Sequence, residues 1–236
     1  MKVIKPFNKY YAVLDNNKYY GIVITSPAYI LNYSDTPVLC HLNGDNTNLG
    51  CGNAFQYVYD GWWDYTNVAS KFGTYSMKMT PDSRTWADWS GFPWEPTTIY
   101  TVEFWFMHNG SGNTGNVFCW NRSGGDRLNY ISINRSGTNT YTVGDDDNPR
   151  VTCTLDDTTW HHFAFTYDGN GKFRGFVDGV FKVEYTKTTY SNAGYYTPDV
   201  NVVCGNVAYY SEYVIHYGIR YVNDFTPPTQ QYIIQV

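Results

Sequence analysis

Residues 160–185 read WHHFAFTYDGNGKFRGFVDGVFKVEY, and this stretch contains two hairpin signals. The first is DGNG at residues 168–171, and the second is DG at residues 178–179. Gly and Asn tolerate the positive φ angles that tight hairpin turns require. The runs between the turns are rich in Phe, Val, Tyr and Thr, which suit a pleated, partly buried surface. The stretch therefore predicts an antiparallel meander of three strands.

Side chains alternate between the two faces of a strand, and this divides the first strand of the meander into two sets. One face carries Phe163, Phe165 and Tyr167, and the other carries Trp160, His162 and Ala164. Because both faces carry apolar bulk, we expect this sheet to be covered on both sides. The alternation does not indicate which face meets the main core.

The meander resembles the signature of laminin-G-like domains in the concanavalin-A-like lectin and glucanase superfamily, through WHHFAFTYDG and FVDG. Other segments match the family pattern in the same order: residues 38–44 (VLCHLNG), 71–79 (KFGTYSMKM), 101–106 (TVEFWF) and 213–228 (YVIHYGIRYVNDFTPP). The last of these resembles the closing strand and tail of versions found in bacteriophage virion proteins. The resemblance implies an all-β fold, an antiparallel two-sheet β-sandwich of the jelly-roll, concanavalin A-like type.

The resemblance covers residues 37–236, which we predict to be one β-sandwich domain. Residues 1–36 precede it and contain two candidate strands, at residues 10–14 and 18–25, around a turn at residues 15–17. This segment is either an extra hairpin that lengthens one sheet or an arm that contacts a neighbouring subunit. The sequence leaves both readings open.

The composition limits the classes of partner. The chain has 236 residues, a net charge of −5 and 19% aromatic residues, so it lacks the clustered positive charge that a nucleic-acid backbone requires. No apolar run has the length of a membrane span, and residues 1–11 lack the apolar core of a signal peptide. We therefore expect no membrane insertion and no export by that route.

The five cysteines have no metal-site spacing, and we expect them to be reduced thiols: Cys40, Cys51, Cys119, Cys153 and Cys204.

Glycoside hydrolysis needs two carboxylates about 5 to 10 Å apart, and the glucanases of the superfamily place them in an E-x-D-x-x-E pattern. The chain has four glutamates, Glu95, Glu103, Glu184 and Glu212, and none lies in that pattern. The sequence also lacks a G-x-S-x-G nucleophile motif. We therefore predict that the protein is not an enzyme and has no catalytic residue.

Carbohydrate binding is the alternative, because aromatic faces stack on sugars while polar groups orient the hydroxyls. Two loop-like segments, residues 43–66 and 80–97, carry five tryptophans. These are Trp62, Trp63, Trp86, Trp89 and Trp94. Exposed together they would form a sugar-binding platform, but buried loop aromatics that close the sandwich or form a subunit contact are the reading we favour.

An acidic turn at Asp145, Asp146 and Asp147 is the best local cluster of hard oxygen ligands. Some laminin-G-like domains bind calcium at loop carboxylates, although the spacing here matches no EF-hand loop. We predict that the protein has no cofactor and retain calcium at this turn as the alternative.

Together these features predict a non-enzymatic structural protein of a tailed-bacteriophage virion: a capsid decoration protein, head fibre or tail component. It would be made in the host bacterial cytoplasm, form a homo-oligomer and contact other virion proteins. The alternative is an adhesin of the same fold that binds cell-surface glycans.

Overall fold

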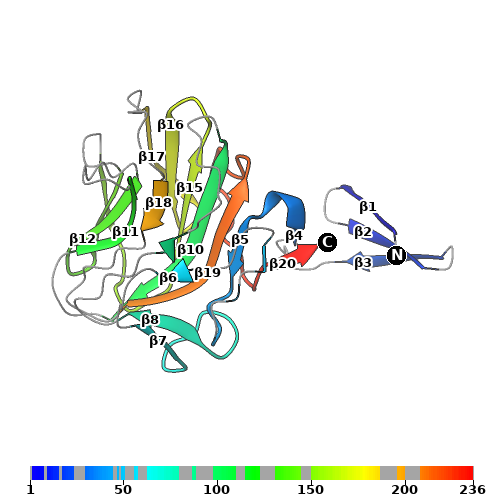
Figure 1. Ribbon diagram of the computed structural model, residues 1–236, viewed down its shortest axis with the longest axis horizontal. Coiled ribbons are helices and arrows are strands. Elements are labelled where there is room, and N and C mark those ends of the chain that lie inside the picture. The colour runs from blue at the N-terminus through cyan, green and yellow to red at the C-terminus, as the bar shows by residue number, and fades with distance from the viewer. Residues whose placement is uncertain are drawn as a thin grey trace.

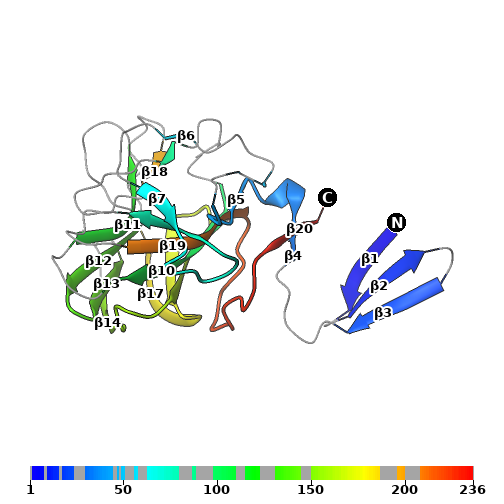
Figure 2. The same cartoon turned by 90° about the horizontal axis from the view of Figure 1, so that it is seen from below.

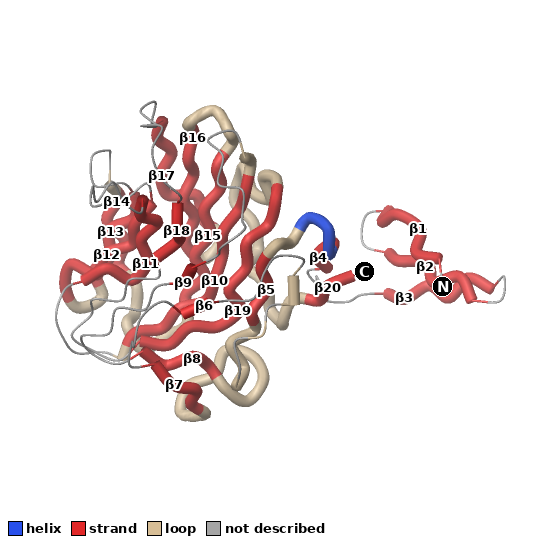
Figure 3. The backbone as a smooth tube through the Cα atoms, in the orientation of Figure 1, coloured by secondary structure: helices blue, strands red, loops and turns tan. Residues whose placement is uncertain are grey.

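The computed structural model shows an almost entirely β-structured chain (Figures 1 and 3). It describes residues 2–7, 10–15, 18–23, 30–44, 47, 49–50, 56–57, 63–79, 87–88, 98–109, 115–122, 131–144, 150–186, 196–199 and 208–235. Within these ranges the one helical segment is the short 3₁₀ turn η1 (Tyr33–Asp35). No helix among them has the length and hydropathy of a membrane span.

Two antiparallel sheets form the sandwich, which confirms the predicted fold class (Figure 1). The large sheet has the order β17-β16-β15-β10-β19-β8-β7, with β5 also paired to β19. Its strands are β5 (Val38–Cys40), β7 (Trp63–Thr66), β8 (Ser76–Met79), β10 (Tyr100–His108), β15 (His161–Tyr167), β16 (Lys172–Val177), β17 (Val180–Thr186) and β19 (Ala208–Tyr217). The small sheet has the order β14-β13-β12-β11-β18. Its strands are β11 (Gly115–Arg122), β12 (Ile131–Gly137), β13 (Thr140–Gly144), β14 (Val151–Thr154) and β18 (Tyr196–Asp199).

The predicted meander is confirmed as β15, β16 and β17, with Phe163 paired to Val177 and Val177 paired to Val180. The turn between β16 and β17 has φ angles of 51° at Asp178 and 76° at Gly179. Two successive positive φ angles match the twist of a tight antiparallel hairpin, which explains why the sequence places Asp-Gly there.

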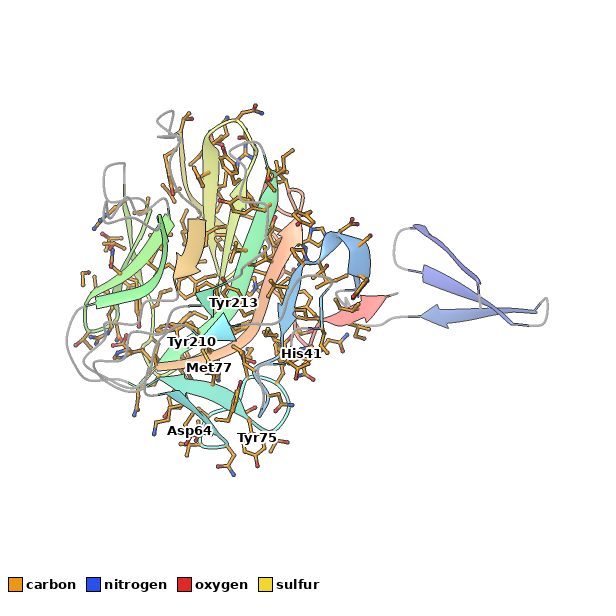
Figure 4. All side chains as sticks on the ribbon, in the orientation of Figure 1. His41, Asp64, Tyr75, Met77, Tyr210 and Tyr213 are labelled. Atoms are coloured by element: carbon orange, nitrogen blue, oxygen red, sulfur yellow. The ribbon has the colours of Figure 1, made fainter. Side chains whose placement is uncertain are left out.

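The main core lies between the two sheets. The inner face of β10 contributes Tyr100, Val102, Phe104 and Phe106, all buried. Phe104 stacks on Phe163 of β15 at a centroid distance of 5.7 Å. Other members come from both sheets: Met77, Ile133, Tyr141, Val143, Phe165, Tyr167, Tyr210 and Tyr213. Met77, Tyr210 and Tyr213 extend from β8 and β19 in Figure 4. Burying an aromatic side chain of this kind stabilises the fold by about 1.5–3 kcal/mol.

The outer face of the large sheet is covered by the segment that follows β19, which we call the C-terminal tail (residues 218–232). Its Tyr221 and Phe225 pack on Ala164 and Phe176 of the meander. Its Tyr232 packs on Leu31, Leu39 and Val214. The sheet is therefore covered on both sides, as predicted, and the face with Phe163, Phe165 and Tyr167 is the one that meets the main core.

Several predicted boundaries were wrong. Residues 43–66 were expected to be a loop, but β6 (Gln56–Tyr57) and β7 lie within them, and β7 ends the large sheet. Likewise β9 (Ala87–Asp88) lies within 80–97 and pairs with β6. The expected strand at residues 71–79 begins only at Ser76. Short strands without clear alternation give little signal in sequence, and tertiary pairing determines them.

The two chain ends form strands outside the sandwich sheets. β20 (Ile233–Gln235) pairs in parallel with β4 (Ile30–Asn32). β1 (Lys2–Phe7), β2 (Tyr10–Asp15) and β3 (Lys18–Val23) form a separate three-stranded sheet, to one side of the sandwich in Figures 1 and 2. The hairpin at residues 10–25 was anticipated, but among the described strands it lengthens neither sandwich sheet.

Candidate functional site

The residues predicted to bind sugar are mostly outside the described residues. Trp62, Trp86, Trp89 and Trp94 fall there, while the backbone of Trp63 forms the start of β7 at the edge of the large sheet. The acidic turn, Asp145, Asp146 and Asp147, also lies outside the described residues, directly after β13. Within the described ranges, no group of three or more His, Cys, Asp or Glu side chains is arranged to hold a metal. The platform and the calcium site both stay predictions.

Glu103, in the family strand TVEFWF, lies on the outer face of β10 and is fully buried. Its carboxylate is ion-paired with Nη1 of Arg220 and accepts a hydrogen bond of 2.8 Å from the hydroxyl of Tyr221. Nε2 of His162 lies 3.3 Å from Oε2 of the same carboxylate. Burial alone would raise the pKa of Glu103, but Arg220 and His162 outweigh it and lower the pKa to about 2. The side chain joins the C-terminal tail to the sheet.

Glu212 is the second acidic residue on this face, and it is also buried. It lies in a β-bulge of β19, where the register to β10 shifts between Glu103 and Trp105, and its φ is 54°. Both carboxylate oxygens lie close to Nδ1 of His41, at 2.8 and 2.9 Å. The backbone N–H of Tyr232 donates to Oε2 at 3.1 Å. Glu212 thus has a full set of internal partners.

The remaining described glutamate, Glu184 on β17, pairs with Arg174 at 2.8 Å and Lys172 at 3.3 Å across the meander. Each of the three described glutamates is thus held by basic, hydroxyl or backbone partners within the chain.

An open groove lies where the C-terminal tail meets the loop before β8, and we call it the tail groove. Its volume is about 820 Å³. Its lining residues are His41, Leu49, Phe72, Gly73, Thr229, Gln230, Gln231, Tyr232, Ile233 and Ile234. His41 follows directly after β5, between the loop that carries Tyr75 and the β4–β20 pair (Figure 4).

The loop on one side of the groove is held by Asn43. Its Oδ1 accepts hydrogen bonds from the backbone N–H groups of Thr74 and Tyr75, at 2.9 and 2.7 Å. A Cβ at Gly73 would lie 2.3 Å from Nδ2 of Asn43, so a larger residue there would displace the side chain that holds the loop. Next to it, Phe72 packs edge-on against Trp105, with ring centroids 5.9 Å apart. Phe72 is therefore presented to the groove from a fixed loop.

The groove chemistry is neutral and mixed. Its described lining combines two aromatic rings, one imidazole, two carboxamides, the hydroxyl groups of Thr229 and Tyr232, and three aliphatic side chains. Such a set can orient hydroxyl or amide groups and stack against an apolar face. Sequence reasoning missed this site because its residues come from positions near 41, 72 and 231, and no local spacing connects them. The quoted motif VLCHLNG contains His41, but its partner Glu212 lies 171 residues away.

Solved structures with the same fold include carbohydrate-active proteins. One is a conserved carbohydrate esterase of the Shiga toxin-encoding bacteriophage phi24B, with a TM-score of 0.57 and 13% identity over 78% of this chain and 99% of that chain. Another is an endo-β-1,4-glucuronan lyase from the fungus Trichoderma reesei, with a TM-score of 0.53 and 14% identity over 73% of this chain and 93% of that one. These likenesses show the fold.

A third similar structure is domain 4 of AbnA, a GH43 extracellular arabinanase from Geobacillus stearothermophilus, solved in complex with arabinotriose. It gives a TM-score of 0.50 and 16% identity over 79% of this chain and 94% of that one. No curated protein matches the sequence. A family model described as the concanavalin A-like lectin/glucanases superfamily matches residues 79–210, more than half of the chain. The chain therefore belongs to the laminin-G-type branch of the concanavalin A-like lectin/glucanases superfamily.

Proposed function

We propose that the chain is a non-catalytic structural protein of a tailed-bacteriophage virion, and that it acts through contacts with other virion proteins and with copies of itself. The observation that supports a non-catalytic role is that Glu103 and Glu212 are both engaged in structural contacts. Both are fully buried, and both connect the large sheet to segments that cover it. Neither is left to act on a substrate.

The C-terminal tail supports the phage assignment. It carries the motif YGIRYVNDFTPP (residues 217–228), which resembles the closing segment of phage virion domains. Its Arg220 and Tyr221 bind Glu103, and Asp224 accepts a hydrogen bond of 2.8 Å from the backbone N–H of Phe181. The motif thus corresponds to a distinct architectural feature, and the phage esterase with the same fold is in keeping with such an origin.

Exposed apolar side chains supply a candidate contact surface. Val180 and Phe181 are 44% and 40% exposed at the start of β17, and Val222 of the tail is 55% exposed. The Phe181–Asp224 hydrogen bond holds these two segments together. Exposed apolar side chains can contribute to contacts with other proteins.

The test is protein mass spectrometry of purified phage particles together with light scattering of the isolated chain. We expect its peptides in stoichiometric amounts in particles and an oligomer in solution. A stable monomer whose peptides are absent from washed particles would contradict the proposal. A Phe181→Ser and Val222→Ser double variant should lower incorporation, whereas Val68→Ser, at a position that is 81% exposed elsewhere, should not.

Carbohydrate binding is the second candidate, and the tail groove favours it. Domain 4 of AbnA, which shares the fold, was solved with arabinotriose. A glycan array of the intact protein, repeated with Trp62→Ala and Trp89→Ala, examines the predicted tryptophan platform. Loss of binding in these variants would support the platform, and no binding in any form would reject the candidate.

A further inference from the structure

We propose that the tail groove binds a neutral saccharide, and that Nε2 of His41 forms a hydrogen bond with one of its hydroxyl groups. The inference rests on the second candidate function, carbohydrate binding. It gives that function a site formed by the C-terminal tail, separate from the tryptophan-bearing loops.

The first support is the fixed orientation of His41. Its Nδ1 lies 2.8 and 2.9 Å from the two oxygens of Glu212. A carboxylate can only accept hydrogen bonds, so Nδ1 carries a proton, and Nε2 is the ring nitrogen that remains to bind a ligand. His41 is 24% exposed and lines the groove, and Nε2 has no partner among the described residues. The ring therefore presents a polar nitrogen at a defined position.

The second support is the backbone on each side of this pair. Four described residues other than glycine have a left-handed φ. Asn139 and Asp178 lie in hairpin turns, where this conformation is expected. Leu42 and Glu212 lie outside such turns, both at 54°, and they adjoin or belong to the His41–Glu212 pair.

For a residue with a side chain this left-handed conformation is strained. The backbone N–H of Glu212 also donates to the carbonyl of His41 at 3.3 Å, so both segments are held in this arrangement. Unusual backbone conformations of this kind gather at binding sites, where the surrounding fold maintains them. The pair has the features of a site built to hold a ring in place.

The third support is the lining of the groove, which indicates the class of ligand. Its described lining includes no Asp, Glu, Lys or Arg, so a charged ligand would find no counter-charge there. The carboxamide residues Gln230 and Gln231 line the groove and give it uncharged polar groups. Phe72 offers a ring face for the C–H surface of a sugar, and Gln230 and Thr229 offer further polar groups. The volume of about 820 Å³ suits a small ligand.

The key variant is His41→Asn. The Asn carboxamide can donate toward Glu212 as Nδ1 does, but it removes Nε2 from the groove. Gln231→Ala removes a second polar side chain from the groove lining, and Asn223→Ala, an exposed position of the same tail outside that lining, is the control. Binding is measured by ligand-detected NMR with neutral arabino-, gluco-, galacto- and manno-oligosaccharides, and folding is verified by thermal melting.

We expect the unmodified protein to bind at least one of these oligosaccharides. His41→Asn and Gln231→Ala should each weaken that binding about tenfold, the effect of one lost hydrogen bond, while Asn223→Ala leaves it unchanged. If His41→Asn fails to fold, Gln231→Ala alone decides the outcome.

Two results would overturn the assignment. Full affinity in both groove variants, with loss in Trp62→Ala or Trp89→Ala, would keep carbohydrate binding and reject the groove. Binding of none of the neutral sugars by the unmodified protein would reject this site and ligand class, and an empty glycan array would reject carbohydrate binding as well.

Discussion

Nδ1 of His161 lies 2.7 Å from Oδ2 of Asp178, and this contact joins the two halves of the family signature, WHH and FVDG. The other oxygen of Asp178 accepts a hydrogen bond of 2.8 Å from the backbone N–H of His162. One carboxylate therefore fastens the β16–β17 turn to the start of β15. The signature therefore encodes a structural connection between the turn and the strand.

This connection gives the first prediction, a loss of stability at alkaline pH. Burial alone would lower the pKa of His161, but its contact with Asp178 outweighs burial and raises it. A raised pKa in the folded state stabilises the protein fully below the unfolded value, and the contribution is lost as pH rises through the folded value. Urea unfolding at about pH 6 and about pH 9 should show this loss in the unmodified protein. Asp178→Asn should reduce the difference, and an unchanged difference would contradict the assignment.

The second prediction concerns acid. The pKa of Glu103 is lowered to about 2 from an ordinary value of 4.5, so its contribution is present above pH 4.5 and is lost as pH falls toward 2. The shift corresponds to a stability contribution on the order of 3 kcal/mol. In Glu103→Gln, the free energy of unfolding should fall less between pH 4.5 and pH 2 than in the unmodified protein, as measured by circular dichroism. At neutral pH it should cost about 3–5 kcal/mol, because Arg220 would lose its counter-charge. A variant as stable as the parent would show that the pair is not a brace.

The third prediction compares two glycines. A Cβ at Gly179 would lie 2.0 Å from the carbonyl oxygen of Phe225, whereas a Cβ at Gly218 would meet nothing within 4 Å. Both have a positive φ, 76° and 96°. Gly218→Ala should therefore cost only the conformational strain, about 1 kcal/mol. Gly179→Ala should cost at least twice that, because the tail backbone must move. Equal melting temperatures for the two variants would show that the tail does not press on this turn.

The fourth prediction concerns the buried pair on the small sheet. Nη2 of Arg135 donates to Oδ2 of Asp157 at 2.7 Å, and the hydroxyl of Tyr141 donates to Oδ1 at 2.5 Å. Removing one partner leaves a buried charge uncompensated, so Asp157→Ala should destabilise the fold by about 3–5 kcal/mol in chemical denaturation. Asp156→Ala, the exposed neighbour, should cost much less. A similar loss of stability in both variants would show that the turn, and not the buried ion pair, determines the effect.

The fifth prediction concerns metal. We expect protein dialysed against micromolar calcium to contain none when its metal content is measured. Bound calcium that disappears in an Asp145→Asn and Asp147→Asn double variant would instead establish a site at the acidic turn.

The meander could be predicted because its turns and alternation are local signals, and the family resemblance supplied the sandwich. The polar contacts of the outer face could not be predicted. Glu103 meets Arg220 across 117 residues, and His41 meets Glu212 across 171. No sequence spacing predicts either contact, because each depends on which strands are neighbours in the folded sheet. The bulge at Glu212, which brings His41 and its partner together, also gives no composition signal, since the bulged residue is not a glycine.

The strand order has a consequence for biosynthesis. The central strand β10 pairs on one side with β19, and the residue that neutralises Glu103 leaves the ribosome 117 residues later. Until then the nascent chain has an unpaired edge on β10, and Glu103 lacks its basic partner Arg220. Closure of such distant contacts is slow, and open edges invite aggregation. We expect chains stalled before β19 to depend on chaperones, and full-length chains to be released from them abruptly once that strand emerges.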